Sequence, residues 1–220
     1  MDSDKKDYTP RTYWESKDFA VPYQMGDQKH RSYMLDLLKR KGVKTLLDDG
    51  CGTAPIFQLI TENEEGRWDN ITKYKGTDYS RTMIETCKEQ FPNGDFEVQD
   101  ARDLMENDDT WDCVLLMHAL DHLDNYQAAI KEAARVSNKY VCIILWRGFV
   151  NEGTNLNPRN RYGKEEGEPD WEDTYLQEYS QESLDKAFKQ AGLVVEEVAE
   201  GELLNSDQSH YNFLYLLRKV

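Results

Sequence analysis

The chain has 220 residues, which is enough to bury one full hydrophobic core, and we expect a single domain over 1–220. Its formal net charge of -15, from 27 basic and 42 acidic residues, opposes binding to a phosphate backbone, so we expect no nucleic acid partner for this acidic protein. Its apolar runs are shorter than the roughly 20 residues of a membrane-spanning helix, and the charged N-terminus lacks the apolar core of a signal peptide. We therefore expect a cytoplasmic protein without a membrane partner; the oligomeric state is open.

The cysteines are widely spaced and form no C-x-x-C pair. Two of them, Cys113 and Cys142, lie inside apolar runs, where a free thiol packs like a small hydrophobic side chain. We therefore expect neither a disulfide nor a zinc site.

The expected elements follow one another in an alternating pattern from about residue 43. The first forty residues are rich in aromatic side chains ahead of a helix predicted over 29–41, and we expect 1–40 to form an N-terminal cap. Short apolar runs then alternate with amphipathic segments, which is typical of a parallel sheet with helices on both faces. The predicted strands are 44–48, 74–78, 95–99, 112–117 and 140–146, and the predicted helices are 55–62, 81–90 and 125–136.

The alternation stops after residue 146. Residues 147–179 are rich in glycine, asparagine, proline and acidic residues, and such a long insertion is either functional or disordered. Its aromatic residues favour a substrate lid. A helix at 181–190 and two β-type runs at 193–198 and 211–218 follow, and we expect these runs to pair as a hairpin at one edge of the sheet. The fold class is therefore α/β: a Rossmann-like, doubly wound, seven-stranded sheet, mostly parallel, with an antiparallel C-terminal strand.

A glycine-rich turn follows the first predicted strand. The run reads Asp48-Asp49-Gly50-Cys51-Gly52-Thr53-Ala54-Pro55. Glycine is needed where the backbone takes up positive φ or where a ligand approaches the main chain. Thr53 is a candidate cap for the next helix, and Pro55 suits its first turn. Ligands of open α/β sheets bind at the carboxyl ends of the strands, so this turn lies at the expected site.

The run resembles the D-x-G-C-G-T-G motif of class I S-adenosylmethionine-dependent methyltransferases. It differs at Ala54, where that family commonly has a third glycine, and at Asp49, where the family usually has an apolar residue. A nicotinamide-type G-x-G-x-x-G motif is the rival, but its last glycine would fall on Pro55. The resemblance implies that Asp48, Gly50, Cys51 and Gly52 bind S-adenosylmethionine.

Three further motifs extend the resemblance over about residues 44–123. Gly76-Thr77-Asp78-Tyr79-Ser80 ends the second strand, Val98-Gln99-Asp100-Ala101-Arg102-Asp103-Leu104 follows the third, and Trp111-Asp112-Cys113-Val114-Leu115-Leu116-Met117-His118-Ala119-Leu120-Asp121-His122-Leu123 contains the fourth. The resemblance implies that Asp78 accepts the ribose hydroxyls, although it could instead cap the next helix. It places Tyr79 over the adenine, although this residue could instead pack on the helix. It places Asp100 and the amide of Ala101 at the adenine edge, and Met117 near the methionine part.

Methyl transfer is an in-line displacement, so the protein must mainly align the reactants and exclude water. A base is needed only when the nucleophile starts protonated, and His118 is the candidate. His122 follows at i+4 and is expected to pack at the start of a helix. A metal site made by these histidines lacks a third ligand of the usual spacing, so we expect no metal.

Four other residues are candidates for binding cofactor or substrate. Arg31 could bind the carboxylate of the cofactor or be an ordinary surface arginine. Tyr13 and Trp14 are candidate substrate-site residues that would close over the bound cofactor, or pack within the cap. Arg147 could meet a substrate carboxylate or pair with the acidic lid.

The sequence therefore predicts an S-adenosylmethionine-dependent methyltransferase that acts on N or O of a small molecule or an exposed protein group. The alternative is a methyltransferase-like protein that binds the cofactor or a partner without turnover.

Overall fold

The computed structural model describes residues 29–62, 66–123, 125–145, 179–204 and 212–220. The helices are α3 (Lys29–Arg40), α4 (Pro55–Thr61), α5 (Arg81–Gln90), α6 (Tyr126–Val136) and α7 (Gln181–Gln190), with short 3-10 turns η2 (Leu120–His122) and η4 (Gly201–Leu203). The strands are β1 (Thr45–Asp49), β2 (Lys73–Asp78), β3 (Phe96–Val98), β4 (Trp111–Met117), β5 (Ser137–Leu145), β6 (Leu193–Glu200) and β7 (Phe213–Lys219).

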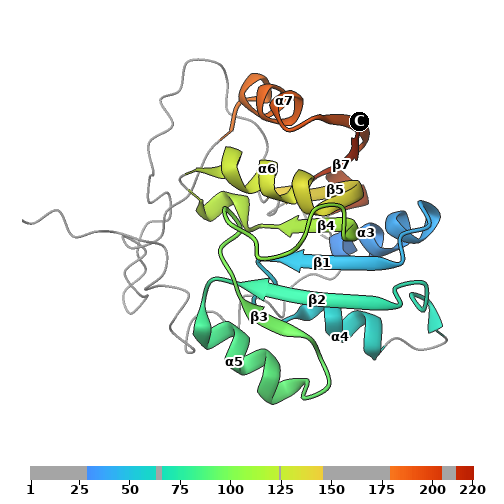
Figure 1. The fold of residues 1–220 in the computed structure, drawn as a ribbon. Helices are drawn as coiled ribbons and strands as arrows, with labels where there is room; N and C mark the ends of the chain where they lie inside the picture. The colour runs from blue at the N-terminus through green and yellow to red at the C-terminus, as the bar shows by residue number, and fades with distance from the viewer. Residues whose placement is uncertain (1–28, 63–65, 124, 146–178, 205–211) are drawn as a thin grey trace, which may run out of the picture.

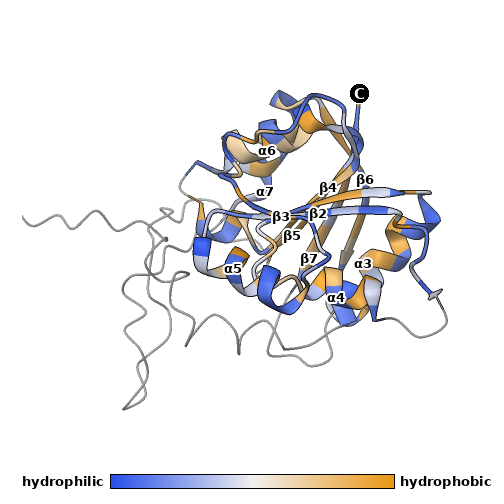
Figure 2. Cartoon of the chain, turned by 60° about the horizontal axis from the view of Figure 1, so that its bottom comes forward, coloured by the Kyte–Doolittle hydropathy of each residue, from blue (hydrophilic) through white to orange (hydrophobic). Residues whose placement is uncertain are grey.

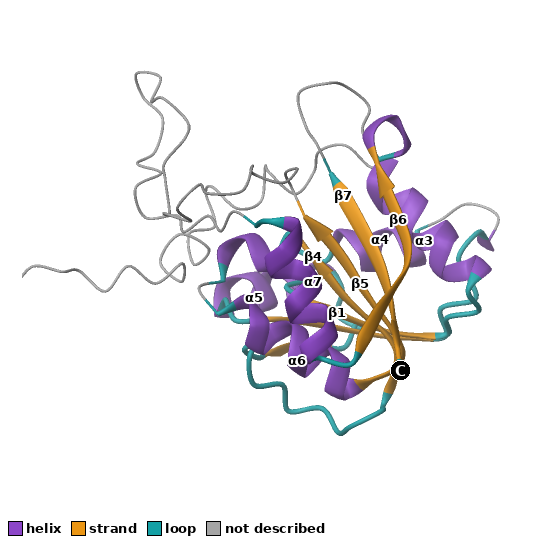
Figure 3. Ribbon diagram, turned by 90° about the horizontal axis from the view of Figure 1, so that it is seen from above, coloured by secondary structure: helices purple, strands orange, loops and turns teal. Residues whose placement is uncertain are grey.

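These strands form one seven-stranded sheet in the order β3-β2-β1-β4-β5-β7-β6. The first five strands along the chain pair in parallel, and β7 pairs antiparallel with both β5 and β6. The strands β6 and β7 lie side by side at one end of the twisted sheet (Figure 3). The expected fold class, including the antiparallel C-terminal strand and the edge pairing of the last two strands, is confirmed.

Helices cover both faces of the sheet (Figure 2). One core cluster contains buried residues of α3, α4 and α5, and the other contains those of α6 and α7. Strand β4 supplies both clusters and is buried along its whole length. Such a continuous apolar run is expected for a central parallel strand whose two faces both pack against helices.

The predicted boundaries agree with the structure to within one or two residues at most ends. The largest difference is at β5, which begins at Ser137, three residues before the expected start. Ser137 is also the C-cap residue of α6, and its backbone N–H donates to the carbonyl of Ala133. The helix therefore passes directly into the strand, although Ser137 and Asn138 are residue types that favour turns.

Two expected segments lie largely outside the described residues. Of the cap at 1–40 only residues 29–40 are described, and of the lid at 147–179 only Tyr179 is described. Tyr179 is buried and packs edge-to-face on Tyr126 of α6, with ring centroids 4.9 Å apart.

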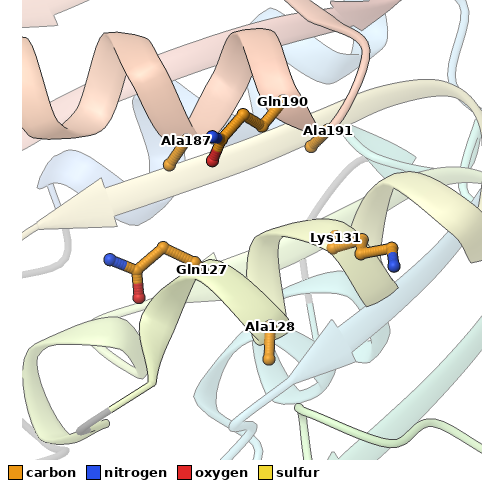
Figure 4. Close-up of a pocket in the computed structure, with 6 residues that line it drawn as sticks. All are labelled: Gln127, Ala128, Lys131, Ala187, Gln190 and Ala191. Atoms are coloured by element: carbon orange, nitrogen blue, oxygen red, sulfur yellow. The ribbon is translucent and has the colours of Figure 1, made fainter.

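Within the described ranges, no helix is long and apolar enough to cross a membrane. A groove between α6 and α7 is lined by Gln127, Ala128, Lys131, Ala187, Gln190 and Ala191 (Figure 4). None of the residues expected to bind cofactor or substrate lines this groove. All four cysteines are buried free thiols.

Asp112, at the start of β4, connects three neighbouring strands. Its Oδ2 accepts hydrogen bonds from two backbone N–H groups: that of Lys44, just before β1, at 2.8 Å, and that of Thr45, the first residue of β1, at 3.3 Å. The Thr45 hydroxyl accepts from the Asp112 backbone N–H at 2.7 Å, and Lys139 of β5 forms an ion pair with Oδ1 at 2.7 Å. This carboxylate satisfies main-chain donors at the end of the central strands that lies opposite the glycine turn.

We predict that Asp112→Ala lowers the free energy of unfolding by about 2–3 kcal/mol, because it leaves two partly buried backbone donors without an acceptor. Asp112→Asn is the matched control. Its amide oxygen still accepts from the backbone, and it loses only an ion pair with the half-exposed Lys139, which is worth about 0–1 kcal/mol. Urea unfolding followed by circular dichroism measures both; equal losses in the two variants would contradict this account.

Candidate active site

The glycine turn follows β1 and lies at the carboxyl ends of the parallel strands, where the arrowheads of β1, β2 and β4 point (Figure 1). The backbone N–H groups of Gly50 and Cys51 both donate to the carbonyl of Thr77 in β2, at 2.7 and 2.9 Å. Gly50 has φ 84°, and a Cβ on it would lie 2.6 Å from the Cβ of Ala119. The turn is thus fixed between β2 and the segment after β4, and only glycine fits at position 50.

Ala54 takes the backbone conformation that its position in the turn requires. It is the N-cap residue of α4 and has φ 59° and ψ 46°, in the left-handed region. This conformation explains why a glycine would suit the position, and it costs an alanine about 1 kcal/mol. The expected cap by Thr53 is wrong: the N-cap residue is Ala54, which makes no side-chain cap bond, while Pro55 does lie in the first turn.

Asp78 links the turn to the next loop. Its Oδ2 accepts the backbone N–H of Gly52 at 3.0 Å, and its Oδ1 accepts that of Ser80 at 2.8 Å. Ser80 itself caps α5 by accepting from Met83 N–H. Each carboxylate oxygen keeps a second lone pair, so the backbone contacts of Asp78 leave acceptor capacity for a ligand hydroxyl.

Two further carboxylates are buried at the end of β1. Asp48 Oδ2 accepts from the hydroxyl of Tyr74 at 2.7 Å, and Asp49 Oδ1 accepts from that of Thr77 at 3.0 Å. Their other oxygens, Asp48 Oδ1 and Asp49 Oδ2, have no hydrogen-bond partner among the described residues. Burial raises the pKa of Asp48 to about 7, that of Asp49 to about 8 and that of Asp78 to about 6.

Arg31 brings a positive charge to this acidic group from the first turn of α3. Its exposed fraction is only 5%, which excludes an ordinary surface arginine. The charge of Arg31 lowers the pKa of Asp48, against the larger raising effect of burial, so the two side chains are close enough to interact. The structure therefore brings Arg31 together with the glycine turn.

The third motif forms a tight turn after β3. Asp100 accepts from Arg102 through two bonds, Nε to Oδ1 at 2.9 Å and Nη2 to Oδ2 at 2.7 Å, and also from the Arg102 backbone N–H. Sequence reasoning missed this pairing. Asp100, Ala101 and Tyr79 are all partly exposed, as residues that meet a ligand would be.

His118 follows β4 with a left-handed backbone, φ 58°, and its N–H donates to the carbonyl of Ile144 in β5 at 2.8 Å. Its Nδ1 lies 3.9 Å from Oδ2 of Asp121. Its ring meets that of His30 edge-to-face, with centroids 5.4 Å apart and an interplanar angle of 80°. Met117, which precedes it, is 8% exposed, and His122 is buried in η2 as expected.

His30 is a residue that sequence reasoning missed. The buried face of α3 contains His30, Arg31, Met34, Leu35, Leu37 and Leu38. A histidine that continues an apolar i, i+4, i+8 series beside a buried arginine was the available signal.

Three of the expected substrate-site residues, Tyr13, Trp14 and Arg147, lie outside the described residues. In the described part of the chain, no group of three or more His, Cys, Asp and Glu side chains is arranged to bind a metal ion.

Residues 21–198 match the family model of the methyltransferase domain. The chain therefore belongs to the methyltransferase domain family, in agreement with its resemblance to class I S-adenosylmethionine-dependent methyltransferases. It is 29% identical over 106 residues to the ubiquinone/menaquinone biosynthesis C-methyltransferase of Campylobacter jejuni. That match covers 48% of this chain and 45% of the relative, so the chain spans about half the length of the curated relatives it matches.

Solved structures share the fold. The magnesium protoporphyrin IX methyltransferase of Synechocystis with bound S-adenosylmethionine has a TM-score of 0.68 at 15% identity, over 100% of both chains. A Haloferax volcanii protein solved in complex with the Trm112 methyltransferase activator has a TM-score of 0.66 at 16% identity, over 93% of this chain and 94% of that one.

The side chains at the turn fit S-adenosylmethionine, which carries positive charge on sulfur and on its amino group. The buried carboxylates of Asp48 and Asp78 are acceptors for cationic and hydroxyl groups, and Asp48 Oδ1 is a buried acceptor with no hydrogen-bond partner among the described residues. Arg31 supplies the opposite charge that a carboxylate needs. A cationic ligand would also favour the ionised form of these acids, which burial alone disfavours.

We predict that Asp78→Asn raises the Kd for S-adenosylhomocysteine about tenfold at pH 8, because an amide nitrogen cannot accept from a backbone N–H. In the unaltered protein the affinity should fall between pH 8 and pH 5, since Asp48 and Asp78, with pKa values of about 7 and 6, take up protons and lose their charge. Calorimetry at pH 8, 6.5 and 5 measures this. A Kd that does not change with pH in the unaltered protein would contradict the role given to these acids.

We also predict that Asp49→Asn stabilises the cofactor-free protein at pH 8 and changes it little at pH 5. The folded protein binds a proton at Asp49 up to about pH 8, whereas the unfolded chain releases it above about pH 4, so stability falls as pH rises through this window. For one proton the free energy of unfolding falls by at most about 1.4 kcal/mol per pH unit. Asparagine does not titrate, so the variant lacks this contribution to the pH dependence. The exposed Asp185→Asn in α7 is the control, and urea unfolding at both pH values is the measurement.

Proposed function

We propose that this methyltransferase transfers the methyl group of S-adenosylmethionine to a nitrogen or oxygen atom of a small molecule, with His118 as the general base. The observation that carries the proposal is the position of His118. His118 follows β4 directly and precedes Ala119, which packs on Gly50 of the glycine turn. The side chain of His118 is 23% exposed, whereas that of Asp121 is 8% exposed. A partly exposed imidazole at this edge can reach an acceptor bound there.

The roles of the cofactor-binding residues are part of this proposal. Asp78 would accept the ribose hydroxyls, while Tyr79, Asp100 and Ala101 would surround the adenine. Asp48, the turn at Gly50, Cys51 and Gly52, and Met117 would lie along the methionine part, with Arg31 paired to its carboxylate. The bound cofactor supplies an electrophilic methyl group on a positively charged sulfur. The chain aligns the acceptor with that methyl group and excludes water, which can contribute about 7–11 kcal/mol.

The acceptor class is supported by the names of the relatives. The Campylobacter jejuni relative is named for quinone biosynthesis and the Synechocystis structure for a porphyrin, and both acceptors are small ring compounds. The first name also motivates a second candidate, methylation at carbon. A phenol that loses its proton to a base becomes nucleophilic at oxygen and at ring carbons, so one base serves both outcomes. An exposed protein group is the remaining acceptor class.

We predict that the protein moves a labelled methyl group from S-adenosylmethionine to at least one member of a panel of phenols, hydroquinones, amines and carboxylic acids. His118→Gln should lower kcat by a factor of about 10²–10⁴ for an acceptor that starts protonated, while the Kd for S-adenosylhomocysteine stays within twofold. Mass spectrometry of the product distinguishes O-, N- and C-methylation. The panel includes a lysate protein fraction.

Two results would contradict parts of this proposal. Full-rate transfer by His118→Gln would remove the base assignment and leave the methyltransferase assignment intact. Tight binding of S-adenosylhomocysteine without transfer to any class of acceptor would favour the alternative, a protein that binds the cofactor without turnover.

A further inference from the structure

Four titratable side chains lie on α3 and on the segment that follows β4, and the function proposed above uses only one of them. His30 is 6% exposed, and Asp121 and His122 are 6% and 8% exposed. His118 alone among the four is partly exposed, and it lies between α3 and η2. Of these four side chains, only that of His118 is therefore accessible to an acceptor.

The contact with His30 restricts the orientation of the His118 ring. An edge-to-face pair with centroids 5.4 Å apart at 80° is a preferred arrangement of aromatic rings, and such pairs contribute beyond their buried area. His30 comes from a helix anchored by its apolar face in the core, so it is a rigid support. The His118 backbone is equally fixed, because its N–H continues the ladder between β4 and β5 in a left-handed conformation.

Asp121 supplies the charge that a protonated His118 needs. Its Oδ2 is 3.9 Å from His118 Nδ1, close enough for an ion pair once the imidazole is charged. With side chains 8% and 23% exposed, the pair is only weakly screened by water. The other charged or titratable residues that α3 and η2 bury are His30, Arg31 and His122.

We propose that His30 and Asp121 are positioning residues for His118: His30 fixes the plane of its ring, and Asp121 stabilises the charge that His118 gains from the acceptor. This inference rests on the proposed base. In the step that it serves, the acceptor atom gives its proton to His118 and an electron pair to the methyl carbon. The methyl–sulfur bond breaks with its electrons going to sulfur, and His118 later releases the proton to water.

The direct test follows the histidine ring signals by NMR during a pH titration, and needs no acceptor. The chain has four histidines, so His118→Gln identifies the signal of His118. In Asp121→Asn the titration midpoint of His118 should move down by about one pH unit, a tenfold loss of proton affinity. The exposed Asp185→Asn of α7 should leave it in place. An unmoved midpoint in Asp121→Asn overturns the role of Asp121.

The role of His30 is tested by comparing His30→Phe with His30→Ala. Phenylalanine keeps an aromatic edge against His118 but cannot carry a proton, whereas alanine removes the contact. On the acceptor found by the panel, His30→Ala should lower kcat at least tenfold with the cofactor KM within twofold, and His30→Phe should restore most of that loss. Equal losses in both variants, or none in either, overturn the ring-positioning role.

Failure of this inference is distinguishable from failure of the proposed function. If the unaltered protein methylates no acceptor, the proposed function fails, and the His118 ring signal in His30→Ala and His30→Phe then decides the positioning role. Restricted ring motion in the Phe variant and faster motion in the Ala variant support it, and identical relaxation overturns it. Thermal unfolding of each variant shows whether a loss follows from unfolding.

Discussion

The carboxylate of Asp78 is the contact on which the site depends. It accepts a main-chain N–H from the glycine turn with one oxygen and a main-chain N–H from the loop after β2 with the other. The carbonyl of Thr77, one residue earlier, accepts two more N–H groups from the turn. Two adjacent residues at the end of one strand therefore set the path of the neighbouring strand's loop, and every other group of the site is arranged around that fixed turn.

This arrangement concentrates negative charge in a buried place. Asp48, Asp49 and Asp78 lie at the ends of two paired strands, and burial raises the pKa of each. Isolated buried carboxylates are costly, and each must be hydrogen-bonded, paired or protonated. Here Asp48 and Asp49 each accept from one hydroxyl and Asp78 accepts from two main-chain N–H groups, and Arg31 is a nearby opposite charge. A ligand with positive charge would complete the neutralisation, so the charge of these side chains and the charge of the cofactor agree.

The sequence predicted most of the fold because its signals are local. The apolar run of β4, the alternation of strands and helices, and the glycine turn each depend on neighbours along the chain. The start of β5 at Ser137 was missed because Ser137 and Asn138 are typical of a turn, whereas the helix here enters the strand without a loop. The pairing of Arg102 with Asp100 was missed because the direction of a side chain is set by tertiary packing. The contact of His30 with His118 was missed because it joins residues 88 positions apart in the chain. The sequence marked Asp49 only as a departure from the family motif. Its burial depends on the pairing of β1 with β2, which is a tertiary contact.

The left-handed backbone of Ala54 has a consequence for how the turn meets a ligand. A glycine there would make the conformation easier to reach and also leave more conformations to choose from when the site is empty. Alanine accepts a small conformational cost during folding, and its buried methyl group then restricts the turn to the one conformation that the core allows. A turn ordered in advance loses little entropy when a ligand binds. The cost of holding Ala54 in the left-handed conformation is therefore met by the folding of the chain and not by the binding of a ligand.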